Sequence, residues 1–472
     1  MNTSLVRHGI AGLALFGLAG CAAVAPGDSR AAVRQLVAER SGATRPIEDA
    51  DDDRSSARVR TLLVDGLTVE DAVEITFLRN HELRAVYTDL DIAESDLVQA
   101  GLLHNPVLDA AAGIPIGGGV VDLSFGVAMD LIDVIYVPLR QRVASARLEE
   151  AKLRIAAEVL ELAWRSQTTA YRHQANEQML EVRRQVAEAS GASAELARRM
   201  RGAGNITELE LASEAALADE AKLEVRLAEV AVRESREELN SLMGLWGSDA
   251  GWTIQSSRLA DPPDDELDIE RLETRAIERS LDLAAAERFV VAAGENVGLD
   301  RASALFPEVV AGGAAERDGG EWDAGPTLSL PIPLFDWGQA RTARARAELR
   351  RARELHHALA VRIRAETRMA RDRLLGHRDR AVHYRAVHLP LRERVVAETQ
   401  LHYNAMQVSP LDLLRAKEAQ IETAARYVEA LRDYWTARAD LGLILAGRIP
   451  PREPGIAPPE LEQLPRLPFP TL

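Results

Sequence analysis

The sequence is poor in cysteine and in aromatic residues, and its 57 basic residues are outnumbered by 73 acidic ones. Of its 472 residues one is cysteine, Cys21, and 4% are aromatic. A single cysteine excludes an intrachain disulfide and a metal cluster built from cysteines alone. Because aromatics are scarce, a core must rest on Ala, Leu and Val, which favours close helix–helix packing over a sandwich or barrel core. The net charge of -16 argues against nucleic acid as a partner, since phosphate binding needs a basic face.

Motifs for catalysis and metal binding are also missing. The sequence has no nucleophile elbow, no Gly-rich phosphate loop and no zinc motif. The helical zinc motif needs two histidines spaced four residues apart. No two of the clustered histidines have that spacing: His356, His357, His377, His383 and His388. We therefore interpret them as surface histidines, and predict no enzyme, no metal site and no cofactor.

The N-terminus carries targeting signals. Residues 1–20 combine Arg7 with a short apolar run and end in Leu18-Ala19-Gly20-Cys21, which is typical of a signal peptide. Leu-Ala-Gly-Cys resembles a bacterial lipobox, which implies cleavage before Cys21 and lipid on its sulfur and new amino group. The alternative is an ordinary secretory signal with a chance cysteine. Lipoproteins retained in the inner membrane usually have aspartate after the lipidated cysteine, so Ala22 favours the outer membrane. Residues 21–66 are expected to form a loosely ordered, lipidated arm.

The rest of the chain reads as a duplication followed by a Pro-rich tail at 448–472. Each repeat, 67–260 and 261–447, contains a helix, a β-hairpin, a long helix, a tip and a returning helix. The β-hairpins are expected at 107–137 and 307–335, and the tips at 202–210 and 404–412. Gly376 is a candidate soft point in the second long helix. Tips about 200 residues apart indicate a duplicated architecture.

Both tips carry helix-start signals. Thr207 and Glu210 form a Thr-x-x-Glu capping box. Ser409 can cap the next helix, with Pro410 at its first position and Asp412 in its first turn, where the helix dipole favours an anion. Beyond the first tip, an apolar stripe continues along the returning helix through Leu209, Ala212, Ala216, Leu223, Leu227 and Val230.

The strand around residue 125 has the length of a membrane strand. Residues 121–131 alternate apolar side chains with polar or small ones, and ~9–11 residues of alternation suit a tilted outer-membrane strand. A soluble half-buried strand gives the same pattern. Four strands from one chain leave open edges, which lipid does not tolerate. Three copies would supply 12 strands, an even number within the known range for membrane barrels.

The ordered set of features resembles the TolC-type outer membrane factor family, over about residues 69–447. The resemblance rests on the duplicated layout, on Gly204-x-x-Thr207-x-x-Glu210-Leu211 and the second tip, and on Leu328-Ser329-Leu330-Pro331-Ile332-Pro333-Leu334-Phe335-Asp336. It implies a mainly α fold with two antiparallel coiled-coil hairpins and four strands per chain. Three chains would form an α-barrel and a 12-stranded β-barrel in the outer membrane. This homotrimer would dock with a periplasmic adaptor (a membrane fusion protein) and an inner-membrane pump to export substrate.

The resemblance also assigns roles to residues. It implies adaptor contact and gating for Gly204, Thr207, Glu210, Ser409, Pro410 and Asp412, although both acids can equally serve only as helix caps. Met406 stands where the family has glycine. Asp122, Ser124 and Asp130 are expected to face the lumen. Residues 93–106 look most like the heavy-metal-efflux branch, which suggests metal cations as cargo. The alternative function is a lipid-anchored periplasmic coiled-coil adaptor or scaffold, a class with a single hairpin.

Overall fold

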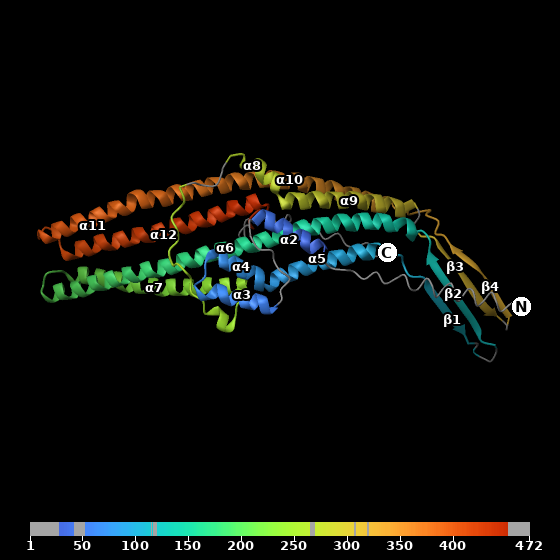
Figure 1. Cartoon of the computed structure of the whole chain (residues 1–472), viewed down its shortest axis with the longest axis horizontal. Helices are drawn as coiled ribbons and strands as arrows, with labels where there is room; N and C mark the ends of the chain where they lie inside the picture. The colour runs from blue at the N-terminus through green and yellow to red at the C-terminus, as the bar shows by residue number, and fades with distance from the viewer. Residues whose placement is uncertain are drawn as a thin grey trace. The chain divides into compact units, whose positions relative to one another are not determined.

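A computed structural model describes residues 28–41, 52–114, 116, 120–264, 270–305, 308–318 and 321–451 (Figure 1). The predicted signal peptide, Cys21 and all but the first four residues of the predicted tail lie outside the described residues. The chain divides into two compact units. The first, here the sheet unit, comprises residues up to 33 with 87–153 and 285–356, and the second, the hairpin unit, comprises 34–86, 154–284 and 357 onward.

The sheet unit contains one antiparallel sheet in the order β1-β2-β3-β4 (Figure 1). Its strands are β1 (Val107–Gly113), β2 (Asp122–Asp130), β3 (Val310–Asp318) and β4 (Glu321–Ser329). The two halves of the chain meet where β2 pairs with β3, from Leu123 opposite Arg317 to Asp130 opposite Val310. Within one chain, β1 and β4 are the outer strands of this sheet. The fold is thus mainly helical with four strands, as predicted.

The register gives the sheet two different faces, because side chains alternate along each strand. Phe125 and Trp322 share one face, with ring centroids 6.2 Å apart. The same face carries Leu108, Leu123, Val127, Met129 and Leu328, together with the charged Arg317 between Leu123 and Trp322. The opposite face carries small residues and the polar side chains Asp109, Asp122, Ser124, Glu316 and Asp323. The alternation read from the sequence is therefore real, and it extends over all four strands.

The ends of both β-hairpins differ from prediction. The first strand pair ends at Asp130 rather than near 137, and helix α6 (Asp133–Gly202) starts three residues later. Asp133 lies in the first turn of α6, where the positive end of the helix dipole stabilises its carboxylate, and it accepts the His104 backbone N–H at 2.8 Å. The second pair ends at Ser329 rather than near 335, and prolines at 331 and 333 cannot donate ladder hydrogen bonds.

Where the structure describes it, at 28–41 and 52–66, the N-terminal arm is mostly helical and not loosely ordered, which corrects another expectation. It contains α2 (Asp28–Ser41) and α3 (Asp52–Val64). Val59 and Leu62 of α3 are buried in a core cluster with Ile75, Met243 and Trp252. The acidic cluster at 49–53 comes just before this short apolar pattern. Because the cluster makes the segment highly charged, its composition did not indicate a helix with a buried face.

The hairpin unit is built from long antiparallel helices (Figure 1). The helices not yet named are α4 (Val69–Arg79), α5 (His81–Ala100), α7 (Glu208–Met243), α8 (Leu272–Arg279), α9 (Leu281–Leu305), α10 (Gln339–His383), α11 (Leu389–Asn404) and α12 (Pro410–Ala446), with short helices η1 (Gly247–Ala250) and η2 (Tyr384–His388). In the hairpin unit, residues 154–202 of α6 and helix α7 form one hairpin, and residues 357–383 of α10 with α11 and α12 form the other. Most of α5 and α9 belongs to the sheet unit. Among the residues that the structure describes, no helix combines the length and apolarity needed to cross a membrane.

Two further details of the long helices differ from prediction. Gly376 lies within continuous α-helix, and the irregularity falls at η2, a π-helical turn. The apolar stripe expected on α7 is not its buried face: Leu209, Leu223 and Leu227 are exposed in the single chain. The residues of α7 that are buried include Glu214 and Ser235. They also include Ala218, Ala221 and Val232, so the buried face of α7 mixes apolar residues with polar ones.

Candidate functional site: the paired hairpin tips

The two tips have the same backbone turn, offset by 202 residues. In the first, Asn205 N–H donates to Met200 O at 2.9 Å and Gly204 N–H to Arg201 O at 3.0 Å. In the second, Gln407 and Met406 donate to the equivalent carbonyls, both at 2.9 Å. This is the Schellman motif, which requires a left-handed residue at its turn.

That left-handed position is glycine in one tip and methionine in the other. Gly204 has φ 74° and Met406 has φ 58°. A left-handed conformation costs an L-residue with a Cβ roughly 1–2 kcal/mol. The missing glycine therefore does not change the turn; it adds strain, and it leaves a methionine side chain 94% exposed at the tip.

Each returning helix starts with the predicted capping box. Thr207 Oγ1 accepts the Glu210 N–H at 3.2 Å, and the Glu210 carboxylate accepts the Thr207 N–H at 2.7 Å. Ser409 and Asp412 repeat the arrangement at 3.2 and 3.0 Å, with Pro410 at the first helical position. The capping roles are confirmed, while adaptor contact stays a prediction for these residues.

The caps keep both acids ionised. Hydrogen bonds from the backbone N–H and hydroxyl of Thr207 hold the pKa of the Glu210 carboxyl below its ordinary value. The hydroxyl and N–H of Ser409 do the same for the pKa of Asp412. The Arg415 guanidinium lowers both values further by attraction. Each tip thus presents a fixed negative charge close to the same arginine.

Arg415 ties the two hairpins together. Its Nη2 donates to Glu214 Oε1 at 2.7 Å, and Ser193 Oγ donates to the other oxygen of that carboxylate at 2.6 Å. The Glu214 side chain is 1% exposed, whereas that of Arg415 is 54% exposed. Three helices, α6, α7 and α12, meet at this carboxylate.

The connection continues along α12 as a polar ladder, defined here by Arg415, Glu418 and Glu422. Their spacing of three and four residues places them on one helix face. Ser190 Oγ donates to Glu418 Oε1 at 3.0 Å. Arg183 Nη1 donates to Glu422 Oε2 at 3.0 Å. The hairpins of one chain are therefore joined near their tips by ionic and hydroxyl contacts rather than by an apolar seam.

Sequence reasoning did not identify Arg415 or Glu214. A signal was present, because Glu214 lies between apolar positions of α7 and Arg415 follows the Asp412 cap by three residues. Both look like ordinary surface charges in sequence. Only the packing of α7 against α12 shows that one of them is buried.

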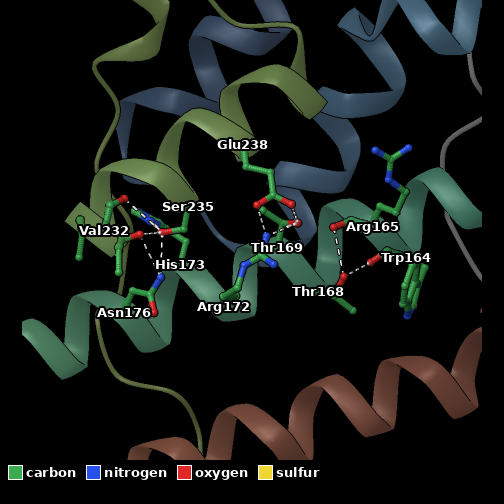
Figure 2. Close-up of polar contacts among 11 residues, drawn as sticks. Trp164, Arg165, Thr168, Thr169, Arg172, His173, Asn176, Val232, Ser235 and Glu238 are labelled. Atoms are coloured by element: carbon green, nitrogen blue, oxygen red, sulfur yellow. Dashed lines mark hydrogen bonds and ion pairs between the residues drawn. The ribbon is translucent and has the colours of Figure 1, made fainter. Parts of the chain in front are cut away.

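A second polar seam joins α6 to α7 farther along the first hairpin (Figure 2). His173 is 1% exposed, and its Nδ1 lies 2.9 Å from Ser235 Oγ, which also accepts the Asn176 side-chain N–H at 3.1 Å. The His173 ring contacts Trp252 edge-on, with centroids 5.2 Å apart. Burial, helped by the Arg236 charge, lowers the pKa of His173 to about 4. This histidine is neutral and structural.

The candidate lumen residues lie on the polar face of the sheet. Asp122 and Ser124 share this face with Glu316 and Asp323. Asp130 Oδ1 instead accepts the backbone N–H groups of Ile132 at 3.0 Å and Val309 at 3.3 Å, and so closes the ends of two strands. The three predicted residues therefore include one with a structural task.

Comparison with known proteins agrees with this geometry. Residues 272–447 match the family model "Outer membrane efflux protein". No curated protein matches the chain. The fold is similar to the Campylobacter jejuni CmeC outer membrane channel, with 15% identity, TM-score 0.68, and coverage of 80% of this chain and 85% of that one.

Two further solved structures are similar over the same share of the chain. The CusC structure has 14% identity and TM-score 0.66 and is covered to 92%. The Neisseria gonorrhoeae MtrE outer membrane channel has 17% identity and TM-score 0.63 and is covered to 89%. Outer membrane efflux proteins are channel proteins, not enzymes. Residues 272–447 thus match the outer membrane efflux protein family model, and the chain has the fold of the CusC, CmeC and MtrE channel structures.

Proposed function

We propose that three copies of this chain form an outer-membrane channel that conducts substrate from a periplasmic adaptor and an inner-membrane pump to the exterior. The observation that carries the proposal is the sheet. It has a largely apolar face, a polar face and two outer strands, β1 and β4, that each pair with a single strand among the described residues. In lipid such edges cost several kcal/mol per unpaired group, so copies must join β1 to β4 until the sheet closes.

Helix α7 supports the same assembly. Leu209, Leu217, Leu223, Leu227 and Val230 are 40–76% exposed in the single chain and recur at helical spacing. A run of this length on a coiled-coil helix favours a neighbouring helix as its cover. A helix from the next copy would bury this stripe as the hairpins close into an α-barrel.

The tips would form the gate and the adaptor contact. The capping boxes at Thr207 and Ser409 fix where the helices begin, and the Arg415–Glu214 pair holds the hairpins of one chain together. An adaptor packing against the tips would have to break or stretch the polar ladder to separate the hairpins. Gly204 and Pro410 shape the turns, and Glu210 and Asp412 supply negative charge at the rim.

The sheet would line a cation-preferring outlet. Glu316 lies directly opposite Asp323 across β3 and β4, with Ser124 next to Glu316 on β2. Like charges directly opposite destabilise a sheet, so their presence favours a functional task over a folding one. Carboxylate rings favour cations in a pore, which is compatible with metal cations as cargo.

The N-terminus would hold the trimer at the membrane through lipid on Cys21. The rival assignment, a periplasmic adaptor or scaffold, requires one hairpin, whereas this chain has two with equivalent tips. Two tips and a sheet whose outer strands need partners from other copies favour the channel.

Planar-bilayer recording tests the proposal. Purified protein in detergent should insert as stepwise, ohmic conductances with cation preference. The double substitution Glu316→Gln with Asp323→Asn should reduce the preference while conductance persists, and Glu321→Gln, which removes one carboxylate from the same face at the end of β4, should reduce it less. Absence of conductance from protein that is folded by circular dichroism would overturn the channel assignment.

A further inference from the structure

The π-turn η2 brings together two histidines that an α-helix would keep apart. His383 immediately precedes η2 and His388 ends it. In an α-helix, residues five apart point about 140° away from each other around the axis. In a π-turn, i→i+5 hydrogen bonding places such residues one above the other. Leu389 N–H donates to Tyr384 O in this i→i+5 pattern, and the two imidazole rings lie 5.0 Å apart between centroids.

The separation of the rings suits a shared metal ion. With Zn–N bonds of about 2.0–2.1 Å, two imidazoles on one ion at tetrahedral or right-angle positions have centroids about 4.5–5.2 Å apart. The observed 5.0 Å falls within that range, and the rings are inclined at 74°. The spacing rule that excluded a metal site from the sequence assumed an α-helix, and η2 breaks that assumption.

The ring nitrogens are available to a ligand. Within the described part of the chain, neither imidazole makes a hydrogen bond or an ion pair, and both residues are exposed. Tyr384 holds the pair in place: its ring contacts His388 at 5.1 Å and packs against the core cluster that contains Ala381 and Leu431. One side of the pair is thus anchored, and the other faces solvent.

The surrounding charge is compatible with a cation. The two nearest arginines on the same helical run are already paired with carboxylates. Arg380 Nη1 lies 3.0 Å from Asp433, and its Nη2 lies 3.9 Å from Glu429. Arg385 lies 3.0 Å from Asp261. An incoming divalent ion would therefore meet compensated rather than net positive charge.

We infer that His383 and His388 form a two-histidine binding site for a divalent transition-metal ion, held by the π-turn at η2 and completed by water. Imidazole nitrogen suits Zn²⁺, Cu²⁺ and Ni²⁺, and Cu²⁺ binds such ligands most tightly of the three. No group of three or more potential ligands occurs among the described residues, so the site is open and its ion exchangeable. Binding requires unprotonated imidazole and weakens in acid. The inference does not depend on the proposed function, because binding is measured without transport.

Cu²⁺ titration of the purified full-length protein in detergent, prepared without a histidine tag, tests the site. Electron paramagnetic resonance at pH 7.5 should show about one Cu²⁺ per chain with two nitrogen ligands. His383→Ala and His388→Ala should each abolish this two-nitrogen signal. The double substitution His356→Ala with His357→Ala is the matched control, because neighbouring positions do not share a helix face, and it should leave the signal unchanged.

Two results would overturn the site. One is a two-nitrogen signal that survives both single substitutions. The other is a signal no stronger in the wild-type protein than in the His383→Ala, His388→Ala double variant. His357, His383 and His388 are exposed and His356 is half-buried, so circular dichroism should be the same for each variant. Zn²⁺ competition for bound Cu²⁺ gives a second, independent measure of the same pair.

Discussion

Removing Arg415 should loosen the contact between the two hairpins of each chain. The Glu214 carboxylate is 1% exposed in the native chain, and in Arg415→Ala it keeps only the Ser193 hydroxyl as a partner. Breaking a buried ion pair by removing one partner costs about 3–5 kcal/mol. Arg415 is itself 54% exposed, so water replaces part of what it provides, and we expect a local loss of about 2 kcal/mol.

That loss should appear in channel opening. If separating the hairpins breaks the Arg415–Glu214 pair, the closed state alone loses its stabilisation, and about 2 kcal/mol shifts the opening equilibrium roughly 30-fold. Basal conductance of Arg415→Ala in planar bilayers should rise accordingly. Hydrogen exchange in the first turns of α7 and α12 should quicken. Arg426→Ala is the control, because Arg426 is exposed and lies 3.9 Å from Glu422 within one helix.

A double-mutant cycle with Glu214→Gln separates the pair from general destabilisation. Glutamine can still accept from Ser193 and needs no cation, so Glu214→Gln should make Arg415→Ala nearly neutral. Additive effects on conductance, or equal effects of Arg426→Ala and Arg415→Ala, would refute the assignment of the pair as the link between hairpins.

Three further predictions follow from single positions. Met406→Gly should relieve the left-handed strain and stabilise the second tip by about 1 kcal/mol in thermal unfolding, whereas Met406→Ala should not. The folded-state pKa of His173 is lowered to about 4, so the unfolded chain takes up a proton at higher pH than the folded one. The free energy of unfolding should therefore fall by about 3 kcal/mol as the pH drops from 6.5 to 4. His173→Gln should flatten that slope in denaturant titrations. Gly312→Val should disrupt the β2–β3 pairing, since a Cβ there would lie 2.2 Å from Val127 O, and a mutant that keeps wild-type conductance and heat resistance would contradict the register.

Local chemistry allowed much of this fold to be predicted. Caps at Thr207 and Ser409 depend on residues three apart, so sequence alone located the tips. Alternation along β2 likewise depends on the strand itself. The ends of the strands were harder, because helix α6 begins at Asp133 through a hydrogen bond from His104, 29 residues away.

What the sequence could not show depends on contacts between distant segments. Leu223 and Glu214 both lie on α7, yet packing exposes the leucine and buries the acid. The π-turn at η2 likewise leaves no periodic mark, because one irregular turn changes which residues meet without changing composition. Pairing between α7 and α12 spans about 200 residues, and a hydrophobic pattern does not report it.

Cysteine cross-linking between the edge strands tests most directly whether copies join β1 to β4. Ala110→Cys in β1 is combined in turn with cysteine at Trp322, Ala324, Pro326 and Leu328, which share its face of the sheet, in a protein whose one native cysteine is Cys21. Disulfides form only when Cα atoms come within about 7 Å. The account predicts that at least one pair yields covalent dimers and trimers, but no larger species, from protein oxidised in detergent. Monomers alone from all four pairs, in protein that is correctly folded, would contradict a closed wall of three copies.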